Sequence, residues 1–514
     1  MYWNIKVCII LITIYSVRAQ SYSAGVVVYR PFFPPDSTSD EIVRENTNSY
    51  VDLIIKNKNK VDILVFPEFG LTNIRPKDKL KEFLSAISSK VGNVSSEICI
   101  KHNLQENIVK LACAAKDNGI YVIANLVEME GEKYYLTTVG LGPDGFLSLK
   151  CRKSHLVNGS NFENNTDEKS CTFTAKFKKH GDVPFTVLFG NDVVHPIPAA
   201  IKTENVIMTS SIKNVLPLNV GFSIYQGFAI SNGINLLVSG YYEKNINSEY
   251  DNYGGSGIYY ANGTSTVAFK PDGPESDAAS GMVLQADIPI KGSSVFPVRV
   301  QSRLVGEITK LNLQYMNISA LNDTSKSLKK CIDSKNCCEF KAELTNDTIG
   351  LYKWIAMANK TFILDQEVDI FLCALVAPSA NALKSFKNIT ISSNVDRSQT
   401  FQSLPLALGP NISPIDFIYN NNTNEMILSK EETVAIFGLL YVVNTAATDA
   451  GSSVALINYS NTTQFRSTTR PSWNGERRQG SSSSSTYRQL TSGVLVSLVF
   501  ILLFFYEYEK VVTF

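Results

Sequence analysis

Histidine is scarce in this chain, and cysteines at metal-ligand spacing are absent. Only four histidines occur among 514 residues, scattered at His102, His155, His180 and His195, and no C-x-x-C motif is present. Structural zinc sites are built from cysteine and histidine ligands at short, regular spacings. The sequence therefore gives little support for a metal site, and we expect no cofactor.

An excess of charge of either sign is also missing. The chain has 48 Lys and Arg against 47 Asp and Glu, a formal net charge of +1, and 44% of its residues are hydrophobic. Disordered chains combine low hydrophobicity with high net charge, and nucleic-acid-binding domains carry a basic surface. We therefore expect a folded protein that binds no nucleic acid and is long enough for two or more domains.

Long apolar runs are confined to the two ends of the chain. The run VCIILITIYSV follows Lys6 and precedes small residues, which is typical of a secretory signal peptide over residues 1–19. Near the other end, Gly480 and five serines precede a polar spacer and the run GVLVSLVFILLFFY. Small residues, spacer and apolar tail are the parts of a GPI-anchor signal, and a single membrane span is the alternative. We expect a secretory-pathway protein tethered to the extracellular face of the plasma membrane.

The remaining cysteines and the asparagines agree with an extracellular location. Eight cysteines remain outside the signal, which predicts disulfides in an oxidising compartment, although the four in the second half allow three pairings. They are Cys99, Cys113, Cys151, Cys171, Cys331, Cys337, Cys338 and Cys373. N-x-S/T motifs also recur and predict a glycosylated surface. The candidate acceptors include Asn93, Asn158, Asn164, Asn262, Asn317, Asn322, Asn346, Asn359, Asn388, Asn421, Asn458 and Asn461.

Strand and helix patterns alternate in the first half of the chain. Buried-strand runs such as AGVVVYRPF, VDILVFPE and IYVIANLVE are interleaved with the helical patterns SDEIVRENTNSYVDLIIKNKN and LQENIVKLACAAKDNG. This alternation predicts an α/β domain over residues 23–290. Apolar alternation with Ser/Asn/Thr-rich breaks then predicts a smaller, mostly β domain over residues 291–459. A Ser-rich stalk with the anchor attachment region follows over residues 460–492, and the apolar tail spans 493–514.

Three segments of the first domain carry a family resemblance. VDILVFPEFGL places Glu68 at the C-terminal end of a buried strand, LKCRKSHL places Lys153 after a hairpin strand, and FTVLFGND ends an apolar strand on Gly190. In order and context they resemble the nitrilase superfamily, which uses a Glu-Lys-Cys constellation, and within it the vanin and biotinidase branch. The segments NVLPL, GINLLVS, GSGIYYANG and CIDSKNCCEF are similar to that branch as well, so that the resemblance covers about residues 23–378.

The resemblance implies an αββα sandwich that hydrolyses carbon–nitrogen amide bonds, with small amides of the pantetheine or biotin type as ligands. In such a site a thiolate attacks the amide carbonyl, a carboxylate moves the proton, and a lysine ammonium stabilises the oxyanion. Carried over to this sequence, Glu68 is the general base and Lys153 the oxyanion partner.

The nucleophile itself is missing. The family pattern has Cys-Phe-Asp after the third strand, whereas this chain has Gly190, Asn191 and Asp192. Glycine has no side chain that can attack, and its permissive dihedrals suit a tight strand-to-loop turn. Cys151 lies close in sequence to Lys153, but we interpret it as the disulfide partner of Cys171.

Further departures cluster at the expected catalytic site. Ser160 stands where the family commonly has a second glutamate, and Glu163 lies too far along the chain to replace it. A glycan at Asn158 would require that loop to face solvent. Ile212 and Lys213 replace a Trp-Met pair before NVLPL.

These observations predict a vanin-like surface protein that keeps the amidase fold and ligand binding but is catalytically inactive or weakly active. One alternative is an active amide hydrolase, for example with a water activated by Glu68 in place of the thiolate. The other is a non-catalytic structural or adhesive glycoprotein.

Overall fold

The computed structural model describes two large parts of the chain. The described residues are 21–34, 36–72, 84, 87–101, 104–156, 160–165, 171–195, 203–212, 214, 218, 220–241, 254–267, 279–290, 318–320, 327–344, 352–364, 366–377, 383–395, 401–409, 415–428 and 430–443. The predicted signal peptide, stalk and apolar tail lie outside them. No helix within these ranges is long and apolar enough to cross a membrane.

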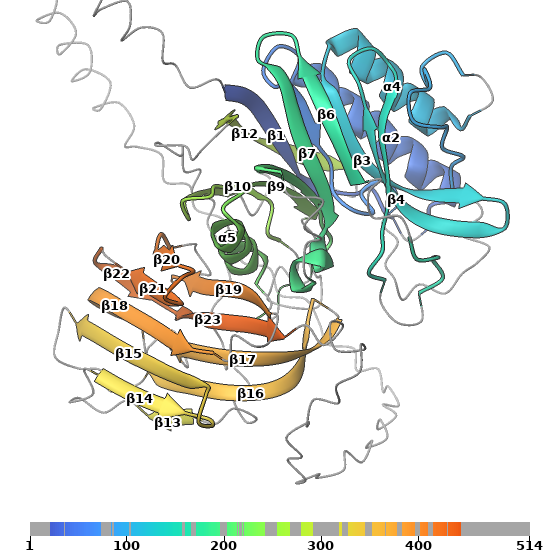
Figure 1. The fold of residues 1–514 in the computed structure, drawn as a ribbon. Coiled ribbons are helices and arrows are strands. Elements are labelled where there is room, and N and C mark those ends of the chain that lie inside the picture. Colours follow the sequence, from blue (N-terminus) through green and yellow to red (C-terminus); the bar gives the residue numbers. More distant parts are fainter. Residues whose placement is uncertain are drawn as a thin grey trace, which may run out of the picture. The chain divides into compact units, whose positions relative to one another are not determined.

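The first part is a 12-stranded sheet folded into two halves (Figure 1). One half has the strands β1 (Ser21–Arg30), β2 (Ile63–Val65), β3 (Tyr121–Glu130), β4 (Lys133–Leu141), β5 (Leu147–Arg152) and β12 (Ser280–Pro289). The other half has β6 (Thr172–Phe177), β7 (Gly181–Phe189), β8 (Asn205–Thr209), β9 (Asn235–Tyr241), β10 (Gly257–Tyr259) and β11 (Ser265–Val267). The halves are joined where β1 pairs in parallel with β9.

Helices cover the outer face of each half. One hydrophobic core lies between the halves, with residues such as Val26 of β1 and Phe185 of β7. Helices α2 (Ser39–Lys56) and α4 (Glu106–Asn118) pack on the outside of the first half. Helix α5 (Gly221–Asn232) packs on the outside of the second half. These layers are the αββα sandwich that the sequence predicts.

The helix boundaries follow from local capping chemistry. Thr38 precedes α2, and its hydroxyl accepts a hydrogen bond from the backbone N–H of Glu41, as an N-cap residue does. Helices α4 and α5 both end at a glycine with positive φ, Gly119 at 68° and Gly233 at 63°. Glycine adopts this left-handed conformation without a Cβ clash, so these residues stop the helices at defined points.

The second part consists of two antiparallel sheets with a core between them. One sheet has β13 (Ile318–Ala320), β16 (Lys353–Ile363), β17 (Gln366–Val376), β23 (Ile436–Val443) and β19 (Phe401–Leu408). The other has β14 (Ser327–Cys331), β15 (Cys337–Leu344), β18 (Lys384–Asn394), β21 (Glu425–Leu428), β20 (Ile418–Asn420) and β22 (Glu432–Val434). The expected β character of this region is confirmed, whereas the exact domain boundaries stay a prediction.

Helix α5 is buried on both sides because it also contacts β19 and the loop after it. The hydroxyl of Ser223 accepts from the backbone N–H of Ala407 at 3.0 Å, and Gln226 donates to the carbonyl of Ile415 at 2.9 Å. A Cβ at Gly227 would lie 2.1 Å from the carbonyl oxygen of Pro405. Only glycine permits this close approach, so α5 connects the second part of the protein to the sheet beneath it.

All eight expected cysteines form disulfides. The predicted pair Cys151–Cys171 is present. The other bonds are Cys99–Cys113, Cys331–Cys337 and Cys338–Cys373, which selects one of the three pairings left open for the second half.

Six of the candidate glycosylation sites lie in the described residues, and each of these asparagines is exposed. They are Asn93, Asn164, Asn262, Asn359, Asn388 and Asn421. The other six, Asn158, Asn317, Asn322, Asn346, Asn458 and Asn461, lie outside the described residues. Glycosylation itself stays a prediction.

Candidate active site

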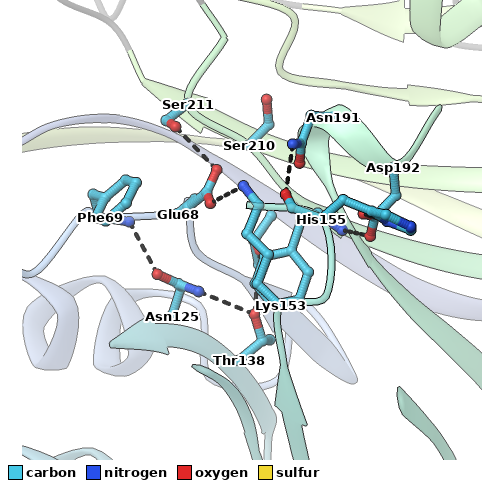
Figure 2. Close-up of polar contacts among 12 residues, drawn as sticks. Glu68, Phe69, Asn125, Thr138, Lys153, His155, Asn191, Asp192, Ser210 and Ser211 are labelled. Atoms are coloured by element: carbon cyan, nitrogen blue, oxygen red, sulfur yellow. Dashed lines mark hydrogen bonds and ion pairs between the residues drawn. The ribbon is translucent and has the colours of Figure 1, made fainter. Parts of the chain in front are cut away.

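The structure brings Glu68 and Lys153 into direct contact inside the protein. Glu68 lies three residues beyond the end of β2, and Lys153 directly follows β5. The Lys153 ammonium donates to Oε1 of Glu68 at 2.7 Å, and the two residues are 4% and 2% exposed (Figure 2). A buried carboxylate and a buried ammonium compensate each other only when they are paired in this way. The two residues are thus placed to act on one bound group, although their catalytic roles stay a prediction.

The second carboxylate oxygen of Glu68 has its own partner. Ser211, two residues beyond the end of β8, donates from Oγ to Oε2 of Glu68 at 2.9 Å (Figure 2). Ser211 is half-buried, whereas Glu68 is almost fully enclosed. Ser211 could not be recognised from the sequence, because it is 143 residues from Glu68 and follows a strand with no distinctive motif.

A polar chain fixes the backbone next to Glu68. Phe69 has a positive φ of 58°, which is strained for a residue with a side chain. Its backbone N–H donates to Oδ1 of Asn125 at 3.1 Å, and Asn125 donates to the hydroxyl of Thr138 at 3.2 Å (Figure 2). Asn125 in the mostly apolar run IYVIANLVE was the available sequence signal for this support.

Gly190 begins the short 3₁₀ helix η2 (Gly190–Val194) after β7. Its φ is not among the positive values, so the backbone does not require glycine there, contrary to the expectation from the turn. Space is the constraint instead: a Cβ at Gly190 would lie 2.8 Å from Oγ of Ser210 and 2.9 Å from the hydroxyl of Tyr225. Those two hydroxyls hydrogen-bond to each other at 2.6 Å. A pair of buried hydroxyl groups therefore fills the space beside the missing nucleophile.

Tyr225 comes from α5, and burial raises its pKa well above the usual value of 10. The negative charges of Glu68 and Asp192 act in the same direction, while the hydrogen bond between Tyr225 and Ser210 acts in the opposite one. Tyr225 is consequently a neutral hydroxyl that cannot take a proton from Ser210. It also ties the site to α5, and through α5 to the second part of the protein.

A second polar cluster is built around Asp192 of η2, two residues after Gly190. Asp192 accepts from the backbone N–H of Phe189 at 2.8 Å and bonds Nδ1 of His155 at 2.9 Å. The rings of His155 and His195 stack with centroids 3.7 Å apart. Burial, and then the neighbouring charge of His155, lower the pKa of His195 to about 4, while Asp192 opposes this shift. His195 is therefore neutral in the folded protein at neutral pH.

The structure also shows the contacts of other residues that differ from the family pattern. The hydroxyl of Ser160 accepts from the backbone N–H of Phe162 at 3.1 Å, which is a local turn contact. Glu163 is exposed and lies 3.9 Å from Lys133, so it does not substitute for a second catalytic glutamate. Ile212 belongs to the apolar core around α5. Asn158 and Lys213 lie outside the described residues.

Metal ligation has no support in the part of the chain that the structure describes, where no group of three or more His, Cys, Asp or Glu is placed to hold an ion. The arrangement instead offers the carboxylate of Glu68, the ammonium of Lys153 and the hydroxyl of Ser211. Such groups can bind and polarise a small amide and move a proton.

Comparison with known proteins gives a consistent set of relatives. The carbon-nitrogen hydrolase family model matches residues 30–216. Vanin-like protein 3 of Drosophila melanogaster is 24% identical over 422 residues, covering 74% of this chain and 76% of that protein. Pantetheinase of Mus musculus is 24% identical over 47% of this chain and 50% of its own length, and biotinidase of Takifugu rubripes is 24% identical over 44% and 47%.

Among solved structures, the Saccharomyces cerevisiae member of branch 10 of the nitrilase superfamily is 16% identical. It covers 52% of this chain and 90% of its own, with a TM-score of 0.40.

Proposed function

Because the chain belongs to the vanin and biotinidase branch of the nitrilase superfamily, we propose that it binds small amides of the pantetheine or biotin type at the Glu68–Lys153 site. We propose also that it has lost the family's thiol-dependent hydrolysis. One observation carries the proposal: the buried Glu68–Lys153 ion pair is intact, while the residue at the nucleophile position is Gly190.

The chemistry of the ion pair supports amide binding. Lysine has three N–H donors, and only one of those on Lys153 is used by Glu68. A second N–H can bond an amide carbonyl oxygen, and the buried setting strengthens such a bond. Without a nucleophile, binding and oxyanion stabilisation alone gave roughly 10³–10⁴ over water in serine hydrolases. The chain is therefore expected to turn amides over slowly or not at all.

A location on the extracellular face of the plasma membrane, held by a GPI anchor, belongs to the same proposal. It is supported by the N- and C-terminal sequence signals and by the four disulfides. Release of the protein from intact cells by a phosphatidylinositol-specific phospholipase would support the anchor. Retention after that treatment would favour the single span.

Ligand-induced stabilisation tests the binding proposal. A ligand that binds only the folded state stabilises it by about 2.7 kcal/mol at a concentration of 100 Kd. Pantetheine and a biotin amide are added to the full-length chain and to the variants Glu68→Gln and Lys153→Met. We expect a raised Tm for the native chain and for the control Glu163→Gln, and no rise for the two site variants.

The alternative, a purely adhesive glycoprotein, predicts that neither amide raises the Tm of the native chain. If neither amide changes Tm at millimolar concentration, Glu68 and Lys153 do not form a site for such ligands, and the proposal fails. If the native chain instead hydrolyses amides at rates typical of enzymes, the proposal that catalysis has been lost is wrong.

A further inference from the structure

We propose that Ser211 serves as a replacement nucleophile for Gly190, so that the residual amide hydrolysis of this protein proceeds through an ester on Ser211. The inference rests on the proposed amide binding at the Glu68–Lys153 site. It adds the residue that attacks, and it changes the covalent intermediate from a thioester to an oxygen ester.

Ser211 has the contacts of an activated nucleophile. Its Oγ donates to Oε2 of Glu68 at 2.9 Å, and Lys153 holds the other oxygen of the same carboxylate at 2.7 Å. A nucleophile within hydrogen-bond reach of a base, with the base oriented by a third group, is the general signature of covalent catalysis. Ser211, Glu68 and Lys153 form that sequence of contacts (Figure 2).

Accessibility distinguishes Ser211 from the neighbouring serine. Ser211 is half-buried, so part of it is open to solvent, whereas Ser210 is 1% exposed. The Ser210 hydroxyl bonds that of Tyr225, which stays protonated because burial raises its pKa, so Tyr225 cannot act as a base for Ser210. Cys151 is excluded because its sulfur is in the disulfide with Cys171. The Ser210 side chain instead fills the space beside Gly190 and has no contact with Glu68 among those that the structure gives. Ser210 is therefore the matched control for Ser211.

The proposed reaction balances without any further reactant except water. Oγ of Ser211 attacks the amide carbonyl carbon while its proton passes to Oε2 of Glu68, and a free N–H of Lys153 stabilises the oxyanion. The C–N bond then breaks as Glu68 returns the proton to the leaving nitrogen, which leaves an acyl ester on Ser211. Water attacks the ester, giving its proton to Glu68. The acid departs, and Glu68 protonates Oγ.

A serine-reactive fluorophosphonate applied to the full-length chain tests the nucleophile directly. Fragmentation of the labelled peptide distinguishes Ser210 from Ser211. We expect the adduct on Ser211, its loss in Ser211→Ala, its retention in Ser210→Ala, and labelling about 100-fold slower in Glu68→Gln because the general base is gone. An unlabelled Ser211, or equal labelling rates with and without the Glu68 carboxylate, would overturn the proposal.

Two substrate measurements keep the test independent of how well Glu68→Gln folds. Hydrolysis of pantetheine or a biotin amide should fall about 100-fold in Ser211→Ala, since the attacking group is removed, and be unaffected in Ser210→Ala. Ser211→Cys should hydrolyse the same amides and become sensitive to iodoacetamide, which does not inhibit the native chain. Equal hydrolysis by the native chain and Ser211→Ala would refute the assignment.

Failure of the further inference can be told apart from failure of the proposed function. If the amides raise Tm in both the native chain and Ser211→Ala but no acyl or phosphonyl adduct forms on Ser211, binding stands and the nucleophile assignment is wrong. If the amides do not raise Tm, the proposed function fails, while phosphonate labelling, which needs no amide recognition, still reports on Ser211.

Discussion

Replacing Lys153 by methionine tests how strongly the site depends on its buried ion pair. The change keeps most of the side-chain volume. Among the residues that the structure describes, it leaves the Glu68 carboxylate, which is 2% exposed, with only the Ser211 hydroxyl as a side-chain hydrogen-bond partner. Removing one partner of a buried pair costs about 3–5 kcal/mol because the other charge stays buried and uncompensated. At roughly 2–4 °C per kcal/mol for a domain of this size, Tm should fall on the order of 10 °C.

The comparison needs a matched pair on the surface and a double variant. Lys133 lies 3.9 Å from Glu163 with both side chains exposed, so Lys133→Met should cost less than about 1 kcal/mol. The double variant Glu68→Gln with Lys153→Met removes both charges and should be more stable than Lys153→Met alone. Urea denaturation of the full-length chain measures all four proteins. A cost for Lys153→Met no larger than that for Lys133→Met would refute the reasoning.

Three further predictions follow from the same structure. Gly190→Ala places a Cβ within 3 Å of two hydroxyls and should lower the free energy of unfolding, measured by urea denaturation, by about 1–3 kcal/mol. Adding Ser210→Gly to this variant should recover part of the loss. If the costs of the two substitutions simply add, the steric explanation is contradicted. Replacing Cys151 and Cys171 together by alanine opens a disulfide of sequence separation 20 and should cost about 3 kcal/mol, read from the urea midpoint against the native chain. Because the pKa of His195 is lowered in the folded chain, the unfolded chain binds a proton there that the folded chain does not. The free energy of unfolding should therefore fall as pH drops from 6.5 towards about 4. His195→Gln should weaken this dependence on pH, and an unchanged dependence would contradict the assignment.

The parts of the site that lie at strand ends were predictable from sequence. Buried strands show as short apolar runs, and the C-terminal ends of parallel strands gather ligand-facing groups at one edge of a sheet. Glu68 follows the parallel strand β2 and obeys this rule. Lys153 follows β5, which belongs to an antiparallel hairpin but runs in the same direction as β2, so the two residues meet although they are 85 residues apart. The disulfide Cys151–Cys171 was also predicted, when Cys151 was set aside as a substitute nucleophile, and the bond is present.

Contacts that depend on register or on side-chain packing could not be predicted. Cys331 and Cys337 face each other because β14 and β15 pair in one register, and Cys338 reaches Cys373 on a strand of the opposite sheet. Neither relation is visible in the spacing of the cysteines. The glycine at position 190 was explained by its turn, yet its φ is ordinary, and side chains far away in sequence determine the space around it.

Folding alone gives little reason for the polar centre of this site. A buried ion pair is weak support for stability, since apolar residues of similar volume often replace one without loss. The site nonetheless keeps Glu68 and Lys153 paired, and next to them it keeps Phe69 in a strained conformation supported by Asn125. Strained residues persist where the surrounding structure over-determines them, and they cluster at functional sites. The arrangement therefore favours the proposed amide binding, with a proton moving between Ser211 and Glu68, over a purely adhesive role.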